Sequence, residues 1–158
     1  MAVEITLTWH EVAYAAAEGV QRRIRRLAKG RVDRYGWDGE RDVWGNDIES
    51  SASEVALAKA REAYWAPSPA PDYAGDVGHW FARSTSLDDG CLILYPDDLD
   101  DRPYALLTGT IPTFKIRGWV YGREGKQPRF DAGSRLRVPA YLVPQGSLRP
   151  FAECRSDG

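Results

Sequence analysis

The segment Gly75-Asp76-Val77-Gly78-His79-Trp80-Phe81-Ala82-Arg83-Ser84-Thr85 carries most of the information about the fold of this chain. Glycines on both sides of Asp76 predict a turn, because glycine and aspartate favour turn conformations. His79–Thr85 then alternates with the period of two that is typical of a strand. The segment therefore predicts a carboxylate at a turn, followed seven positions later by a basic side chain, Arg83, on a strand.

Further strand-like segments follow in the second half of the chain. The sequence Asp89-Gly90 is typical of a tight hairpin turn. It predicts that His79–Thr85 pairs with the next strand in the chain. The remaining predicted strands are Cys91–Tyr95, Tyr104–Thr108, Thr113–Tyr121 and Val138–Val143.

The first part of the chain is predicted to be helical. Thr8 and Glu11 fit a capping box, and apolar residues recur at helical spacing as far as Gly30. Residues 31–46 are predicted to form a loop. Asp47 is predicted to cap a second helix that runs to about Ala63, before the prolines that begin at Pro67. Small residues at 50–53 would let this helix lie close to a sheet.

Two helices followed mostly by strands predict an α/β (α+β) fold, with N-terminal helices packed on a central mixed β-sheet. The length of 158 residues, 43% of them hydrophobic, suits a single domain. Within it we distinguish an N-terminal helix (1–30), a core (47–121) and a C-terminal extension (122–158). The two cysteines have no paired spacing, so a disulfide scaffold and a cysteine-rich zinc site are not expected. No signal peptide and no membrane span are predicted.

Glu54 on the second predicted helix and Asp76 at the turn are candidate metal ligands. Metal-dependent phosphodiester hydrolysis needs hard oxygen ligands around a divalent ion, which lowers the pKa of a bound water. A nearby cation, here Arg83, would stabilise charge on the phosphate. Each residue also has a structural interpretation. Asp76 can be a turn former that binds local backbone N–H groups. Glu54 can be a solvated helix residue, and Arg83 can be the partner of another acid. All three alternatives stay open.

Basic residues gather in two places although the net charge is −2. Such patches can bind phosphate whatever the net charge, and aromatic residues interleave with the second group, as in nucleic-acid grooves. A solvated basic surface is the alternative for both groups. The candidates for nucleic-acid contact are Arg22, Arg23, Arg25 and Arg26 on the first helix, and Lys115, Arg117 and Lys126 in the second half. The acidic residues at 97–101 are predicted to form a solvated loop.

Residues 47–121 resemble the PD-(D/E)XK nuclease superfamily, which has the restriction-endonuclease-like fold, and more narrowly small phage and prophage proteins of that type. The resemblance implies that Glu54 is the acid of the helix, Asp76 the metal ligand of the turn and Arg83 the basic member. It further implies Mg²⁺ or Mn²⁺ as cofactor, DNA as partner and the bacterial host cytoplasm as location. The segments behind it are Ile48–Lys59, Asp76–Gly78, Ala82–Thr85, Phe114–Trp119 and Tyr141–Gln145.

Two positions depart from the family pattern. The second acid falls on Phe81, which cannot ligate a metal. Arg83 stands where lysine is usual, and arginine stays protonated and is a poor base. The resemblance therefore leaves two functions open. The first is DNA binding with metal-dependent hydrolysis. The second is a catalytically inactive member that binds DNA or a protein, for example in counter-defence or recombination. A structural or assembly protein without a nucleic-acid role is a third alternative.

Overall fold

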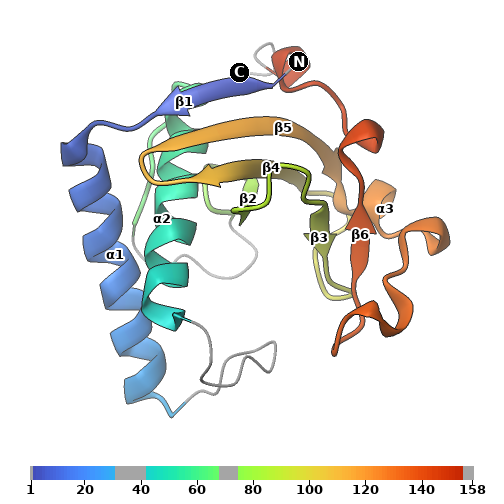
Figure 1. Cartoon of the computed structure of the whole chain (residues 1–158), viewed down its shortest axis with the longest axis horizontal. Coiled ribbons are helices and arrows are strands. Elements are labelled where there is room, and N and C mark those ends of the chain that lie inside the picture. Colours follow the sequence, from blue (N-terminus) through green and yellow to red (C-terminus); the bar gives the residue numbers. More distant parts are fainter. Residues whose placement is uncertain (1, 31–41, 68–74, 155–158) are drawn as a thin grey trace.

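The computed structural model describes residues 2–30, 42–67 and 75–154, and Figure 1 shows their arrangement. A pair of long helices lies on one side of a central sheet, and a smaller sheet with several short helical turns lies on the other. The strands are β1 (Val3–Thr6), β2 (Phe81–Thr85), β3 (Leu92–Leu94), β4 (Pro103–Thr110), β5 (Thr113–Tyr121) and β6 (Tyr141–Val143). The helices are α1 (Trp9–Ala28), α2 (Val43–Ala60) and α3 (Gly122–Gly125), with the 3-10 turns η1 (Pro128–Phe130), η2 (Gly133–Arg135), η3 (Gln145–Ser147) and η4 (Phe151–Cys154).

The central sheet has four strands in the order β1-β5-β4-β2. β1 and β4 pair antiparallel to β5, whereas β2 pairs parallel to β4, with Phe81 opposite Tyr104 and Arg83 opposite Leu106. The sheet is therefore mixed, and the predicted class of helices packed on a central mixed sheet is confirmed. The more specific restriction-endonuclease-like fold stays a prediction.

Both faces of the central strand β4 are covered, which explains why six consecutive residues, 103–108, are buried. Ala105 and Leu107 face the cluster that contains the buried residues of α2. Tyr104 and Leu106 face a second cluster, formed with β3 and β6. The central sheet is thus the middle of three layers, and α1 packs on the outside of α2 (Figure 1).

The predicted hairpin between His79–Thr85 and Cys91–Tyr95 is wrong. β3 pairs antiparallel with β6 in a separate two-stranded sheet, and β2 pairs with β4 instead. The physical reason is burial: Leu92 and Leu94 are fully buried against Tyr104 and Leu106. β3 therefore covers the face of the central sheet and does not extend its edge. The part of the chain treated above as an extension supplies β6, so it takes part in this layer.

The start of α1 is as predicted. The Thr8 hydroxyl accepts a hydrogen bond from the backbone N–H of Glu11 at 3.2 Å, and the Glu11 carboxylate accepts one from the backbone N–H of Thr8 at 2.7 Å. The helix ends at Ala28, close to Gly30, which has a positive φ of 61°.

The predicted start of the second helix is wrong. Asp42 is the N-cap, and its carboxylate accepts a hydrogen bond from the backbone N–H of Gly45 at 2.8 Å, so α2 begins at Val43. Asp47 lies inside the helix, where Arg23 and Arg26 of α1 bind its carboxylate. The end at Ala60 is slightly earlier than predicted. Within the predicted loop, Trp44 belongs to α2, whereas residues 31–41 lie outside the described residues.

Candidate functional site

The turn before β2 positions Asp76. Its backbone N–H donates to the carbonyl of Trp80 at 2.7 Å, and its Oδ2 accepts a hydrogen bond from the backbone N–H of Ala82 at 2.8 Å. Gly75 has a φ of 85°, and a Cβ there would lie 2.5 Å from the carbonyl oxygen of Gly78. A larger residue therefore does not fit at position 75. The contacts of Asp76 agree with its interpretation as a turn former whose side chain binds the backbone.

The strand that follows is shorter than the predicted His79–Thr85. β2 begins at Phe81, because Val77 and Trp80 close the turn on each other with an N–H···O bond of 3.0 Å from Trp80 to Val77. His79 lies in this turn and is exposed. Partial shielding of the imidazole from solvent, together with the charges of Arg61 and Arg102, lowers the pKa of His79.

Glu54 lies on the face of α2 that is turned inward, and only 5% of it is exposed. Its Oε1 accepts a hydrogen bond from Arg22 at 2.7 Å, and its Oε2 accepts one from the other terminal nitrogen of Arg22 at 2.8 Å. The indole Nε1 of Trp65 donates to the same Oε2 at 3.0 Å. The interpretation of Glu54 as a solvated helix residue is therefore wrong.

The two carboxylates interact through their charges. Burial, together with the charge of Glu54, raises the pKa of Asp76 to about 7, although the N–H of Ala82 and the charges of Arg83 and Arg22 oppose the shift. The structure thus brings Glu54, Asp76 and Arg83 into one electrostatic neighbourhood. It adds Arg22, whose pKa the carboxylate of Glu54 raises against the effect of burial.

Arg83 binds an acid from the loop after β3. Its guanidinium donates to Oδ1 of Asp98 at 2.6 Å, and Oδ2 of Asp98 accepts a hydrogen bond from the backbone N–H of Tyr95 at 2.8 Å. The alternative in which Arg83 pairs with another acid is therefore observed. Asp98 is half-buried and bonded, so the prediction of a solvated acidic loop is wrong for this residue.

Phe81, at the position of the missing acid, packs against an aromatic ring. It stacks on Tyr104 with ring centroids 4.9 Å apart and an angle of 11° between the planes. The guanidinium of Arg83 lies 5.3 Å from the centroid of the same tyrosine ring. Burial, together with the charge of Asp98, raises the pKa of the Tyr104 hydroxyl to about 12. Tyr104 therefore joins the aromatic and the charged parts of the site.

The residues present do not fit a divalent ion. Mg²⁺ requires about six oxygen ligands in near-octahedral geometry, whereas both oxygens of Glu54 and one of Asp76 already accept hydrogen bonds. The guanidinium of Arg22 would repel a cation beside Glu54. Among the described residues, no group of three or more His, Cys, Asp or Glu side chains could hold a metal. Arg22 thus engages both oxygens of a carboxylate that the resemblance assigns to the ion.

The basic residues of α1 are largely committed to acids. Arg23 is only 6% exposed and donates to Oδ2 of Asp47 at 2.7 Å, so the prediction that it contacts nucleic acid is contradicted by its burial. Arg22 is bound to Glu54 and also lies 3.4 Å from Glu18. Arg25 and Arg26 are more exposed but form ion pairs with Glu18 at 3.3 Å and with Asp47 at 2.7 Å. This group thus joins α1 to α2 and provides little free positive charge.

The second group of basic candidates also has partners. Asp88 forms ion pairs with Arg117 and, at 4.0 Å, with Lys115. Lys126 donates to the carbonyls of Pro96 and Asp98, and its side chain is only 14% exposed. Its bonds stabilise the loop after β3, which argues against the predicted role of Lys126 in nucleic-acid contact.

Several residues of this neighbourhood were missed in the sequence. Trp65 is 11 positions from Glu54 and Asp98 is 15 positions from Arg83, and no local pattern predicts these two pairings. Arg22 was singled out for phosphate contact, yet its partner Glu54 is 32 residues away. The single available signal was the turn composition around Asp98, which suits a side chain that binds backbone N–H groups.

Comparison of the chain with family models, curated proteins and solved structures finds no match. None of the described helices is both long and apolar enough to cross a membrane.

Proposed function

We propose that the protein binds DNA and does not hydrolyse it, as a catalytically inactive relative of the nuclease-type proteins that residues 47–121 resemble. The observation behind this proposal is the state of Glu54, whose two oxygens accept three hydrogen bonds from Arg22 and Trp65. A carboxylate engaged in this way is a poor ligand for Mg²⁺ or Mn²⁺.

Hydrolysis also lacks a second requirement, which is free positive charge beside the phosphate. With a pKa of about 7, Asp76 has the basicity of a general base. Stabilisation of the phosphate, however, requires uncommitted positive charge, and Arg22 and Arg83 are each bonded to a carboxylate. With Asp76 ionised, the neighbourhood of two arginines and three acids carries a net negative charge. Such a site does not attract a phosphodiester.

DNA binding is assigned to a different surface, the C-terminal basic segment (residues 122–149). Its exposed arginines include Arg123, whose guanidinium lies 4.7 Å from the ring centroid of Tyr121, and Arg129, which lies 4.5 Å from that of Phe130. Cations held over aromatic rings are suited to contact backbone phosphates and stacked bases. The basic residues of the segment are Arg123, Lys126, Arg129, Arg135, Arg137 and Arg149; its acids are Glu124 and Asp131.

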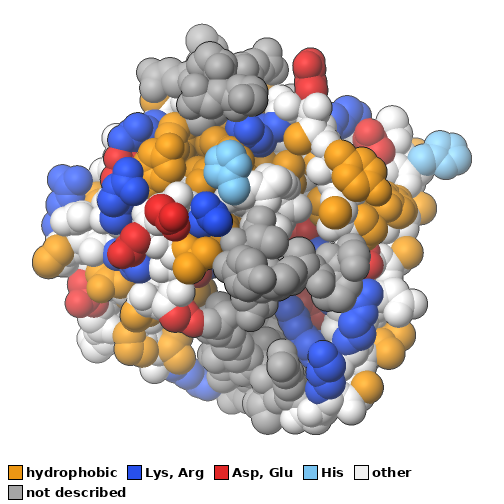
Figure 2. Space-filling model, turned by 180° about the vertical axis from the view of Figure 1, so that it is seen from behind, with side chains coloured by type: hydrophobic (Ala, Val, Ile, Leu, Met, Phe, Trp, Pro, Cys, Tyr) orange, Lys and Arg blue, Asp and Glu red, His pale blue; other side chains and the backbone are white. Residues whose placement is uncertain are grey.

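The footprint on DNA is expected to be small. Figure 2 shows acidic side chains among the basic ones on the reverse face, so among the described residues no broad basic patch covers that face. With about four arginines in contact with phosphates, the logarithm of the binding constant should fall with the logarithm of salt concentration with a slope of about −3 to −4.

Fluorescence anisotropy with a labelled duplex and a labelled single strand, at several salt concentrations, tests the proposal. The double variant Arg123→Gln/Arg129→Gln should weaken binding and reduce the salt slope by about 2. Arg25→Gln/Arg26→Gln removes the same charge from α1 and should change binding little. Failure of the protein to bind DNA at low salt would exclude DNA binding, whereas DNA cleavage with Mg²⁺ or Mn²⁺ would exclude inactivity. Binding to a protein and a phage or prophage origin stay predictions.

A further inference from the structure

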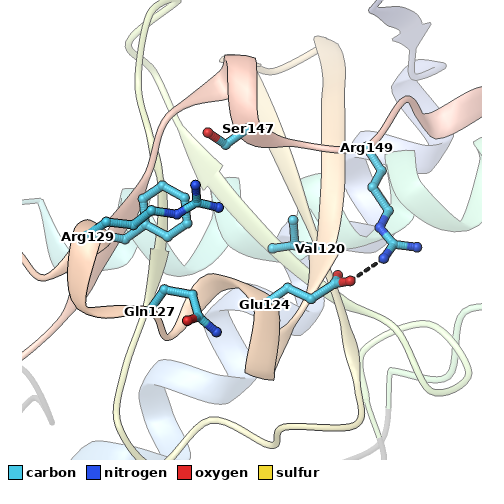
Figure 3. Close-up of a pocket in the computed structure, with 7 residues that line it drawn as sticks. Val120, Glu124, Gln127, Arg129, Ser147 and Arg149 are labelled. Atoms are coloured by element: carbon cyan, nitrogen blue, oxygen red, sulfur yellow. Dashed lines mark hydrogen bonds and ion pairs between the residues drawn. The ribbon is translucent and has the colours of Figure 1, made fainter.

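A small polar pocket lies on the side of the molecule formed by the C-terminal basic segment. It has a volume of about 320 Å³, is open to solvent on one side and is lined by residues of the end of β5, α3, η1 and η3. Figure 3 shows Arg129 and Ser147 on one side, Glu124 and Arg149 on the other, and Val120 between them. The volume is at the lower end of the range of small-molecule sites.

The acid of this pocket is fully used by protein groups. Glu124 forms an ion pair with Arg149 across the pocket wall, and its second oxygen accepts a hydrogen bond from the backbone N–H of Tyr121 at 2.9 Å. Glu124 therefore compensates one positive charge and has both oxygens engaged.

Arg129 supplies a second positive charge that has no acidic partner among the described residues. Its guanidinium is held 4.5 Å from the ring centroid of Phe130, which is itself buried. Contact with the ring limits the positions of the guanidinium without neutralising its charge. The pocket thus carries about one net positive charge in a defined place.

The other polar groups are arranged as donors. In the described part of the chain the Ser147 hydroxyl has no hydrogen-bond partner, and it lies on the same side of the pocket as Arg129 in Figure 3. Arg149 uses one terminal nitrogen for Glu124, which leaves further N–H groups for a ligand. Gln127 donates to the carbonyl of Arg123 at 2.7 Å, and this bond fixes its amide.

We infer that this pocket binds a single phosphate group. A phosphate presents oxygens in several directions and can accept hydrogen bonds from Arg129, Ser147 and Arg149 together, whereas a planar carboxylate suits one guanidinium. The phosphate can come from a DNA strand or from a free nucleotide. Only the first source rests on the DNA binding proposed above.

The test uses the full chain and three probes: inorganic phosphate, thymidine monophosphate and a single-stranded oligonucleotide. Binding is followed by ¹H–¹⁵N chemical-shift titration at constant ionic strength, with chloride as reference anion. Phosphate and the nucleotide should shift the amides of residues 127–130 and 147–149, and Arg129→Gln should weaken this binding about tenfold, the effect of one charge-assisted hydrogen bond. Ser147→Ala should weaken it several-fold.

Arg25→Gln is the control, because it removes one exposed arginine on α1 that does not line the pocket. It should leave phosphate binding unchanged. The inference is overturned if phosphate causes no localised shifts, or if Arg25→Gln weakens binding as much as Arg129→Gln. Phosphate binding without oligonucleotide binding would keep the pocket and reject DNA binding. Oligonucleotide binding without phosphate-induced shifts would reject the phosphate pocket and keep DNA binding.

Discussion

Arg22 and Glu54 form a bidentate ion pair between α1 and α2, with nitrogen–oxygen distances of 2.7 and 2.8 Å. The pair joins residues 32 positions apart in the chain. It lies beside Asp76, on whose carboxylate both charges act. The predictions below concern this arrangement.

Replacement of Arg22 should destabilise the protein strongly. Arg22→Gln leaves the 5% exposed Glu54 without its cation, and loss of one partner of a buried pair costs about 3–5 kcal/mol. Urea unfolding measures the change. Arg25→Gln is the control, because the side chain of Arg25 is 37% exposed and an exposed pair contributes about 1 kcal/mol or less. Equal losses in the two variants would show that the Arg22–Glu54 pair has no special role.

The same substitution should create an affinity for divalent ions. The unaltered protein is expected not to bind Mn²⁺, because Arg22 engages both oxygens of Glu54. In Arg22→Gln, Oε1 of Glu54 loses its hydrogen bond, while Trp65 still binds Oε2 and Ala82 still binds Asp76. Added Mn²⁺ should then bind weakly and restore part of the lost stability, since a ligand of the folded state stabilises it. Electron paramagnetic resonance of free Mn²⁺ measures the binding. Tight binding of Mn²⁺ by the unaltered protein would contradict the assignment.

Asp76 should make stability depend on pH. Its pKa is raised from 3.8 to about 7 in the folded protein, so between these values the folded state keeps a proton that the unfolded state has lost. Stability then falls as the pH rises from about 4 to about 7 and levels off above. Asp76→Asn should remove this decline, because asparagine does not ionise and its oxygen can still accept from Ala82. Unfolding curves at several pH values measure it, and parallel profiles of both proteins would contradict it.

The two glycines of the turn that holds Asp76 should differ in how much stability is lost when each is replaced by alanine. Gly75→Ala places a Cβ 2.5 Å from the carbonyl of Gly78 at a φ of 85°, and such strain costs about 1–3 kcal/mol. Gly78→Ala is the matched control: it has a φ of 59° with nothing within 4 Å of the added Cβ, so about 1 kcal/mol is expected. Thermal unfolding compares the two. A larger loss at Gly78 would argue against close approach as the cause.

Restoring an acid at position 81 should not produce a nuclease. Phe81→Glu supplies the acid that the resemblance implies at this position and that this chain lacks, but Arg22 still engages Glu54 and Arg83 still binds Asp98. The variant should lose stability, because it gives up the stacking of Phe81 on Tyr104. A DNA cleavage assay with Mg²⁺ and Mn²⁺ is the measurement. The double variant Arg22→Gln/Phe81→Glu is the informative companion, and cleavage by Phe81→Glu alone would show that the Arg22–Glu54 pair does not prevent metal binding.

Local features of the fold could be predicted because their causes are local. The capping box at Thr8 involves residues three positions apart, and β4 and β5 are separated by a two-residue turn. The cap of α2 was misassigned because two aspartates, Asp42 and Asp47, compete on sequence grounds. Only the contacts of Asp47 with Arg23 and Arg26 decide between them.

Pairing across long separations could not be predicted. The Asp-Gly turn after β2 suits a hairpin, yet β3 is held against the face of the sheet by Leu92 and Leu94. The choice between edge and face depends on which arrangement buries more apolar surface, and that comparison requires the positions of β4 and β6. The placement of Glu54 near Asp76 was expected, whereas the arginine that engages Glu54 was not.

The order of residues alone was enough to predict two helices before most of the strands, a carboxylate at a tight turn and a phenylalanine where the resemblance implies an acid, although β1 ahead of α1 was not predicted. Periodicity, capping and glycine conformations act over a few residues and can be seen in the sequence. Which guanidinium meets which carboxylate was decided by the packing of α1 on α2 and of β3 on the sheet. These contacts join distant parts of the chain, and they determine how much charge in the site is left for a ligand.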